Sequence, residues 1–389
     1  MCIFVSDQDV MNKKDKHKRI HLSPPHLSQV ELELIQEALF QNWVAPAGPQ
    51  LQAFEQALSD YLHRRSIVAL NSGTSALHLA LKLLGVEAGD EVICPTLTFV
   101  ATVNPVLYQQ ATPVLVDSEP NTWNMCPIQL EKAIQHRIKI SKKPKAIIVV
   151  HLYGQPAQLT TIQAIAQKYE IPLIEDAAEA LGSSYQGQKV GTWGDVGVIS
   201  FNGNKIITTS AGGALITKEA AQAQKAVFWA TQAKEKATHY EHREVGYNYR
   251  LSNVLAAIGV GQMEHLEVRV TRRREIFEFY HTHLSKDKVS FQPEIEGTFS
   301  NRWLTGILLN ILNPKITPET IRLALEAENI ESRPLWKPMH LQPLFEGTPY
   351  YGEQVAEDLF SRGLCLPSGS SLTEADLNRI VLAIEKVLK

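Results

Sequence analysis

Cysteine is scarce in this sequence, and the positions of the few cysteines argue against two common stabilising devices. Only 4 of the 389 residues are cysteines, and none forms a CxxC pair or lies near a histidine-rich tract. We therefore expect neither a disulfide framework nor a metal site, and we expect a protein of a reducing compartment, the cytoplasm. The four cysteines are Cys2, Cys94, Cys126 and Cys365.

Long apolar runs and an excess of one charge are also missing. No stretch approaches the roughly 20 apolar residues that a membrane span needs. Lys plus Arg number 38 and Asp plus Glu number 41, a formal net charge of −3, so the chain lacks the basic excess of a nucleic-acid-binding surface. We expect no membrane and no nucleic acid among its partners. The phosphate-binding motifs GxxxxGK[ST] and GxGxxG are absent too, which disfavours a P-loop NTPase and a Rossmann dehydrogenase.

What the sequence does contain is a repeated change between short β-branched runs and helix-like segments. Hydrophobic residues make up 44% of the chain, enough for a large core. Continuously apolar runs separated by helices are typical of a parallel sheet covered on both faces. The sequence therefore predicts an α/β fold in which a large domain has a mostly parallel central sheet. Strands are predicted at 66–70, 90–95, 112–117, 145–151, 171–176, 197–201 and 303–312, and helices at 28–41, 74–84 and 159–169. Ser28 is the expected N-cap of the first helix.

The chain is expected to divide into three parts. Residues 1–20 are polar and rich in lysine, and we interpret them as a flexible arm. Residues 21–253 carry the alternating strands and helices of the large domain. Residues 254–389 begin with a long arginine-rich helical segment and form a smaller C-terminal α+β domain.

Three strand ends carry unusual polar residues, and the first of them follows 66–70. There the sequence NSGTS leads into a helix that includes Thr74 and Ser75. Hydroxyl groups and free N–H groups at a helix start form an anion site, most plausibly for a phosphate. An ordinary serine or threonine helix cap explains the same residues equally simply.

The other two strand ends carry carboxylates and a lysine. Asp176 closes the run at 171–176 and Glu179 follows it, whereas Lys205 comes four residues after the next strand. A second β-branched run, which ends in Gly212-Gly213, follows Lys205, so we expect the lysine to lie between two strands. Taken alone, helix capping is the simpler explanation for Asp176, and a surface position is the simpler explanation for Lys205. Together with the phosphate site, however, they match what pyridoxal phosphate requires. The phosphate anchors that cofactor, a carboxylate keeps its pyridine nitrogen protonated, and a lysine forms the Schiff base.

At this point the sequence resembles a known family. The motifs NSGTSALHLAL, GDEVICPTLTFVATVNP, IEDAAEALGSSY, SFNGNK and GYNYRLSN are similar to those of the DegT/DnrJ/StrS sugar aminotransferases, in the same order, from about His21 to the C-terminus. The family has the aspartate aminotransferase fold, fold type I of the pyridoxal phosphate enzymes. LSPPHLS, NWVAPAGP, DSEPNTWNM and RPLWKPMHLQPLF further resemble the branch that makes UDP-4-amino-4,6-dideoxy-N-acetylglucosamine, the bacillosamine type.

The resemblance implies a role for individual residues around the cofactor. Lys205 would be the catalytic lysine that forms the Schiff base, Asp176 would pair with the pyridine nitrogen, and Phe99 would stack on the ring. Glu179 would lie close to the ring, and Asn248 would reach the cofactor phosphate of a partner subunit. Thr74, Ser75 and Ser200 would hold the phosphate.

The resemblance also implies substrate contacts. His340, in PMHLQP, would lie near the sugar nucleotide, and Asn202, Arg333 and Trp336 are weaker candidates. Core or interface packing explains Trp336 equally well.

One departure from the family and one agreement bear on the reaction. Many members carry Gly-Glu-Gly-Gly after the lysine, whereas this chain has Ser-Ala-Gly-Gly at 210–213. A carboxylate role there is excluded, and the loop would be strained if Ala211 needed a positive φ. Dehydratase relatives replace the lysine by histidine, but Lys205 is intact, which favours transamination.

The expected function is therefore a pyridoxal phosphate-dependent aminotransferase acting in polysaccharide or glycan biosynthesis. Its amino donor would be L-glutamate and its acceptor the C4 ketone of UDP-4-keto-6-deoxy-N-acetylglucosamine. A homodimer would share its active sites between subunits. Two alternatives stay open: an enzyme of the same family that acts at C3 or on a dTDP- or GDP-linked sugar, and a non-catalytic cofactor-binding regulator.

Overall fold

The computed structural model describes residues 18–63, 65–310, 313 and 315–389. Most of the expected N-terminal arm, residues 1–20, lies outside this part of the chain. Of its last residues, Arg19 pairs with Glu326 through an N–O distance of 2.6 Å, and Ile20 is buried beside Ile330. The packed chain therefore begins before residue 21.

The central feature is an eight-stranded sheet in which only β9 runs against the other strands. Its order is β1-β9-β8-β5-β4-β2-β3-β14, and all pairs from β8 to β14 are parallel. The six strands predicted before residue 202 are all present, within two residues at each end. The strands are β1 (Ser66–Leu70), β2 (Glu91–Pro95), β3 (Thr112–Val116), β4 (Ala146–Val150), β5 (Leu173–Asp176), β8 (Val196–Ser200), β9 (Gly213–Thr217) and β14 (Tyr350–Tyr351).

Helices cover both faces of this sheet, as its continuously apolar strands require. Along β4, for example, Ile148 packs with α3, α4 and α7, whereas Ile147 and Val149 face α5 and α6. At the β1 end, α2 and α8 cover the second face. The helices of this region are α1 (Gln29–Phe40), α2 (Pro49–Tyr61), α3 (Gly73–Leu83), α4 (Asn104–Tyr108), α5 (Pro127–Lys139), α6 (Leu159–Lys168), α7 (Ala220–Ala230) and α8 (Asn253–Glu264), with the 3-10 turns η1 (Val100–Thr102) and η2 (Leu152–Gly154).

The predicted cap of the first helix is confirmed. Ser28 Oγ accepts a hydrogen bond from the Val30 N–H at 3.3 Å, and the Glu31 carboxylate accepts one from the Ser28 N–H at 2.7 Å. This reciprocal arrangement is a capping box.

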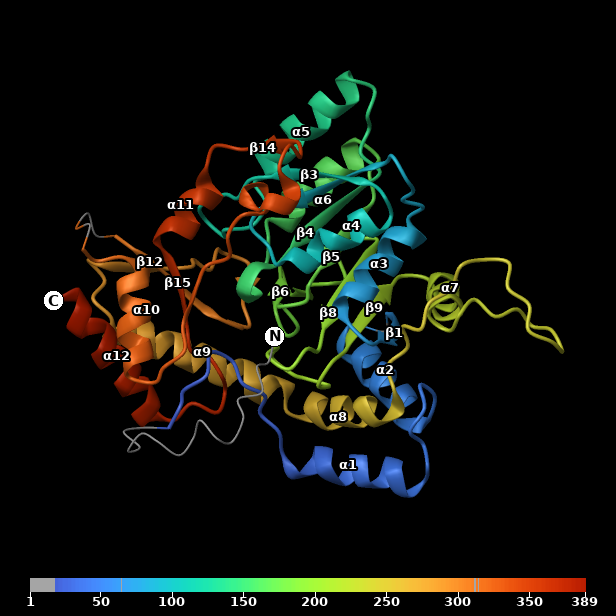
Figure 1. Cartoon of the computed structure of the whole chain (residues 1–389), viewed down its shortest axis with the longest axis horizontal. Coiled ribbons are helices and arrows are strands. Elements are labelled where there is room, and N and C mark those ends of the chain that lie inside the picture. The colour runs from blue at the N-terminus through green and yellow to red at the C-terminus, as the bar shows by residue number, and fades with distance from the viewer. Residues whose placement is uncertain (1–17, 64, 311–312, 314) are drawn as a thin grey trace.

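A smaller antiparallel sheet follows in the C-terminal part, drawn in orange and red in Figure 1. Its order is β10-β12-β15-β13, and the predicted strand at 303–312 is realised as β12. Its core contains Ile307, Leu325 and Ile384. The elements are β10 (Val289–Phe291), β12 (Thr305–Leu309), β13 (Arg333–Pro334), β15 (Gly363–Leu366), α9 (Leu266–His283), α10 (Pro318–Ala327), α11 (Val355–Arg362), α12 (Glu374–Leu388), η3 (Met339–Leu341) and η4 (Pro343–Phe345). A third, three-stranded sheet joins β11 (Thr298–Phe299), β6 (Ser184–Tyr185) and β7 (Gln188–Lys189).

The two regions are interleaved, both at the proposed boundary between residues 253 and 254 and again at β14. Helix α8 begins there and packs against α1 and α2, and β14 returns from the C-terminal part to join the large sheet beside β3. The segment between α7 and α8 leaves the body of the molecule as a projecting arm (Figure 1). Within the described residues, no helix is long and apolar enough to cross a membrane.

Candidate active site

Three strand ends meet at one edge of the large sheet. Strands β1, β5 and β8 run in the same direction, so their carboxyl ends lie together. The loop before α3 follows β1, Asp176 ends β5, and Ser200 ends β8. Ligands of open α/β sheets bind at such carboxyl edges, as the sequence predicted for these residues.

Helix α3 begins at this edge with a serine cap. Ser72 Oγ accepts a hydrogen bond from the Ser75 N–H at 3.0 Å, and Ser75 Oγ donates to Asn71 Oδ1 at 2.6 Å. The cap explanation is therefore correct for Ser72, and the buried Ser75 hydroxyl is held inside the loop. The N–H groups of Gly73 and Thr74 have no partner within the helix, by their position in the first turn. These two groups remain available for an anion.

Close backbone packing shapes this helix start. A Cβ on Gly73 would lie 3.1 Å from Ser200 Cβ, and a Cβ on Gly213 would lie 2.4 Å from the Gly73 nitrogen. Only glycine allows β9 and the end of β8 to approach α3 so closely. The half-buried hydroxyl side chains of Thr74 and Ser200 therefore lie at the same helix start.

Asp176 is a buried carboxylate, and none of the described residues forms an ion pair with it. Its Oδ2 accepts from Thr102 Oγ1 at 2.7 Å and its Oδ1 accepts from the Ala178 N–H at 3.1 Å. Burial raises its pKa, and these two donors act against the rise, with a smaller contribution from Lys205. Lys205 in turn pairs with another carboxylate, that of Glu179. Asp176 thus has acceptor capacity left for a positively charged ligand.

Lys205 lies between a carboxylate and an aromatic ring. Its Nζ is 3.4 Å from Glu179 Oε1 and 4.0 Å from the centroid of the Trp303 ring, and its side chain is 11% exposed. Glu179 is fully buried, and its Oε2 accepts from the Tyr153 N–H at 2.7 Å. Burial raises the pKa of Glu179 to about 7, although Lys205 and the Tyr153 N–H oppose the rise. The lysine is therefore mostly buried, oriented by two contacts, and next to a group that can hold a proton near neutral pH.

The strand predicted directly after Lys205 is not formed. The β-branched run at 206–209 was expected to be a strand, but β9 begins only at Gly213. The run folds into a tight loop because the Thr208 hydroxyl and the Thr209 N–H both bond to the Phe201 carbonyl. The left-handed residue of the loop is Ser210, with φ of +68°, so the anticipated strain at Ala211 does not arise.

Trp303 was not identified from the sequence, although it contacts the lysine directly. Its indole Nε1 donates to the Asn204 carbonyl at 2.8 Å, and Ser23 Oγ donates to the same carbonyl at 2.7 Å. The buried Arg273 guanidinium bonds to both the Ser23 hydroxyl and the Trp303 carbonyl. Four segments far apart in sequence thus form a closed network beside Lys205. No local pattern could have indicated it.

Glu175, which neighbours Asp176, has a structural role. Its carboxylate accepts hydrogen bonds from the N–H groups of Gly191, Trp193 and Gly194 and from His151 Nε2. The Ala157 N–H donates to His151 Nδ1 at 3.2 Å, so the proton of the neutral ring is on Nε2. Successive strand residues point to opposite faces, which separates this carboxylate from Asp176.

A series of aromatic contacts leads from Phe99 through Trp336 and Tyr153 to Trp303, the ring beside Lys205. Phe99 is 53% exposed, and its ring centroid is 5.5 Å from that of Trp336. Trp336 also packs on Tyr153 at 5.1 Å, and its backbone N–H donates to the Tyr153 hydroxyl. Tyr153 adopts a left-handed φ of +55°. It therefore connects Glu179 to the Trp336 segment through its own backbone and side chain.

The remaining predicted residues lie in different surroundings. His340 is bonded on both ring nitrogens, to Thr96 at 2.7 Å and to Glu357 at 3.2 Å. Arg333 is exposed and pairs with Glu331 at 2.9 Å. Asn202 is exposed, and its amide donates to Asn204 at 2.9 Å. Asn248 is exposed, and its backbone carbonyl accepts a hydrogen bond from Asn71 Nδ2 of the same chain at 3.2 Å.

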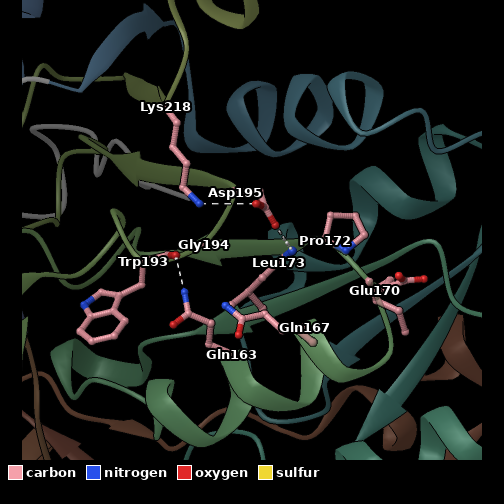
Figure 2. Close-up of a pocket in the computed structure, with 11 residues that line it drawn as sticks. Gln163, Gln167, Glu170, Pro172, Leu173, Trp193, Gly194, Asp195 and Lys218 are labelled. Atoms are coloured by element: carbon pink, nitrogen blue, oxygen red, sulfur yellow. Dashed lines mark hydrogen bonds and ion pairs between the residues drawn. The ribbon is translucent and has the colours of Figure 1, made fainter.

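A separate pocket of about 250 Å³ lies elsewhere (Figure 2). Its lining includes Leu173, which begins β5, and Asp195, which precedes β8. It therefore lies at the amino ends of these strands, opposite the edge that carries Lys205. Asp195 pairs there with Lys218 at 3.5 Å.

The residues at the carboxyl edge fit pyridoxal phosphate. Unpaired N–H groups and hydroxyls suit the phosphate, the buried Asp176 suits a protonated ring nitrogen, and Lys205 is placed for covalent attachment. The fold and site thus define a pyridoxal phosphate-dependent enzyme of fold type I.

Comparison with known proteins agrees with this class. The sequence matches the DegT/DnrJ/EryC1/StrS aminotransferase family over residues 25–385, and the chain belongs to that family. It is 50% identical to EpsN of Bacillus subtilis (strain 168), assigned as a pyridoxal phosphate-dependent aminotransferase, over 94% of this chain and 95% of that protein. It is 37% identical to the GDP-perosamine synthase of Escherichia coli O157:H7, over 95% of this chain and 98% of the relative.

A solved structure supports the cofactor as well as the fold. The PLP form of Spr1654 from Streptococcus pneumoniae superposes with a TM-score of 0.86 at 26% identity, covering 96% of this chain and 100% of that one. The chain is a pyridoxal phosphate-dependent sugar aminotransferase.

Proposed function

We propose that this enzyme transfers the amino group of L-glutamate to C4 of UDP-4-keto-6-deoxy-N-acetylglucosamine. The observation that carries the transamination is the position of Lys205, whose Nζ lies between the Glu179 carboxylate and the Trp303 ring at the edge where Asp176 ends β5. A non-catalytic regulator would not need both Lys205 and Asp176 in this arrangement.

Each residue then has a defined task. When bound, the cofactor supplies an electron sink for the carbanion at the donor Cα. Lys205 Nζ removes the proton from that Cα and later returns a proton to the sugar carbon. Asp176 keeps the cofactor's ring nitrogen protonated, and Phe99 packs on the ring. Glu179 holds the Lys205 ammonium in place when the lysine is not covalently attached.

The helix start of α3 would hold the cofactor phosphate. Gly73 and Thr74 offer N–H groups, and the hydroxyls of Thr74 and Ser200 add side-chain donors. Ser75 supports the site by fixing the preceding loop through Asn71. The positive end of the helix dipole adds to the attraction.

The sugar nucleotide would enter along the aromatic wall of Phe99 and Trp336. Asn202 and Arg333 are the polar side chains exposed for it. His340 would act by position, because its bonds to Thr96 and Glu357 fix the Trp336 segment against the end of β2.

The identity of the nucleotide rests on the motifs shared with the bacillosamine-type branch. A second candidate, a GDP-linked 4-keto sugar, is favoured by the similarity to GDP-perosamine synthase over nearly the whole chain. The test is a panel of UDP-, GDP- and dTDP-linked 3-keto and 4-keto sugars, assayed for 2-oxoglutarate formation from L-glutamate. The highest kcat/KM should belong to the UDP-4-keto sugar, whereas preference for the GDP-4-keto sugar would replace our substrate by the second candidate.

We also propose a homodimer with shared active sites. Apolar side chains are exposed on and just after α1, including Phe40 at 93%, and the projecting arm carries Tyr240 at 81%. These surfaces suit a second copy of the chain, and Asn248 lies at the base of the arm, where it bridges to Thr231 just after α7. Sedimentation of the purified enzyme should give twice the chain mass, and a monomer that is fully active would refute the proposal.

A further inference from the structure

A chain of two hydroxyl groups ends on Asp176. Thr98 Oγ1 lies 2.6 Å from Thr102 Oγ1, and Thr102 Oγ1 lies 2.7 Å from Asp176 Oδ2. All three side chains are buried, with relative exposures of 1%, 1% and 4%. Burying a hydroxyl group costs free energy unless it is hydrogen-bonded, so each of these two hydroxyls needs a defined partner.

The number of available hydrogens fixes the direction of the two hydrogen bonds. A threonine hydroxyl has one hydrogen to donate, and an ionised carboxylate can only accept. Because Thr102 donates to Asp176, its oxygen must accept from Thr98. Thr98 therefore supports Thr102 without touching Asp176.

The same segment carries the residue assigned to the cofactor ring. Thr102 ends the 3-10 turn η1, and its N–H donates to the carbonyl of Phe99 at 3.0 Å. A single turn thus places the Phe99 ring on one side and the Thr102 hydroxyl on Asp176. Any shift of this turn moves the ring contact and the carboxylate together.

We propose that Thr102 is a positioning residue for Asp176, whose hydroxyl holds Oδ2 so that the carboxylate stays ionised and oriented toward the cofactor's ring nitrogen. This inference rests on the proposed function, in which Asp176 keeps that nitrogen protonated. Burial works against the ionised carboxylate, and the Thr102 hydroxyl is the strongest of the groups that oppose this effect. Without that hydroxyl, Asp176 becomes a stronger base and takes the proton from the ring nitrogen.

The test compares three substitutions. Thr102→Val removes only the hydroxyl and keeps the shape, Thr102→Ser restores a hydroxyl, and Thr98→Val is the matched control one step further from Asp176. The rate of the half-reaction with L-glutamate should fall about tenfold in Thr102→Val, with unchanged affinity for glutamate. Thr102→Ser should return the rate to within about twofold of wild type, and Thr98→Val should lower it by less than about threefold.

A readout independent of turnover is the ¹⁵N chemical shift of ring-labelled pyridoxal phosphate bound to each variant. In Thr102→Val it should move toward the value of an unprotonated pyridine, and in Thr102→Ser it should match wild type. An unchanged shift in Thr102→Val, or a serine variant as impaired as the valine variant, overturns the inference. If Thr102→Val does not fold, Thr102→Ala compared with Thr102→Ser gives the same decision.

The results distinguish a failure of the proposed function from a failure of the role of Thr102. If wild-type enzyme does not react with glutamate, the proposed function fails. If wild type reacts and Thr102→Val is unchanged in rate and in ¹⁵N shift, only the role of Thr102 fails.

Discussion

The Nζ of Lys205 lies 4.0 Å from the centroid of the Trp303 ring. These residues are far apart in sequence, and the network through the Asn204 carbonyl brings them together. An ammonium group over an indole face is attracted by the ring's quadrupole. The ring therefore orients the free lysine without a hydrogen bond to its nitrogen.

Two substitutions of Trp303 distinguish the contribution of its ring from that of its N–H group. Trp303→Phe keeps a ring face and loses the bond to Asn204, whereas Trp303→Leu loses both. We expect the rate at which apoenzyme takes up pyridoxal phosphate to fall roughly tenfold in Trp303→Leu and about threefold in Trp303→Phe. Absorbance stopped-flow measures this rate. Equal losses in the two variants would contradict a role for the ring.

The carboxyl group of Glu179 makes the stability of the apoenzyme depend on pH. Its pKa is raised from 4.5 to about 7 in the folded chain, so the folded state binds this proton more tightly than the unfolded state. Its contribution is therefore complete below pH 4.5 and is lost as pH rises toward about 7 and above. The loss amounts to about 3 kcal/mol.

Glu179→Gln isolates this contribution from other titrating groups. Relative to wild type, the variant should gain stability between pH 5 and pH 8, measured by urea unfolding of both apoproteins at each pH. A constant difference between the two proteins across this range would show that Glu179 does not titrate there.

Two glycines that flank the Lys205 loop in sequence, Gly203 and Gly213, test the phosphate site. In Gly213→Ala the new Cβ would lie 2.4 Å from the Gly73 nitrogen, so β9 must move away from the start of α3. We expect affinity for pyridoxal phosphate to fall more than about tenfold, with a loss of about 2 kcal/mol in unfolding free energy. Gly203→Ala is the matched control, because its Cβ would come no closer than 3.8 Å to Ser210. Similar cofactor affinity in the two variants would argue against a phosphate at this helix start.

Shared active sites predict complementation between inactive variants. Lys205→Ala and Asn248→Ala should each be impaired alone. Mixed dimers contain one site with both residues intact, so an equal mixture should recover about a quarter of wild-type activity after subunit exchange. Activity no higher than the average of the two separate variants would mean that the Asn248 side chain does not serve the site of the partner subunit.

The large sheet was predictable from sequence because each of its main strands is a continuous apolar run. The polar strand ends were predictable for a related reason, since parallel strands bring their carboxyl ends together. The sequence alone therefore suffices to place Lys205, Asp176 and the start of α3 at one edge of the sheet.

The supporting residues could not be predicted, because long-range packing decides their roles. Glu175 and Asp176 are adjacent acids at a strand end, and only the folded chain reveals that one of them binds three backbone N–H groups. Trp303 and Thr102 carry no local signal of contact with Lys205 or Asp176. The run after Lys205 was interpreted as a strand because its β-branched composition outweighed the side-chain bonds that fold it into a loop.

The most direct test of the account is the visible absorption spectrum of the purified enzyme with pyridoxal phosphate, before and after L-glutamate is added. We predict a visible band from cofactor bound to Lys205, absent in Lys205→Ala, that converts to the near-ultraviolet band of pyridoxamine phosphate as 2-oxoglutarate forms. A visible band that glutamate leaves unchanged would contradict the donor half-reaction, and the absence of any band would contradict the assignment of Lys205.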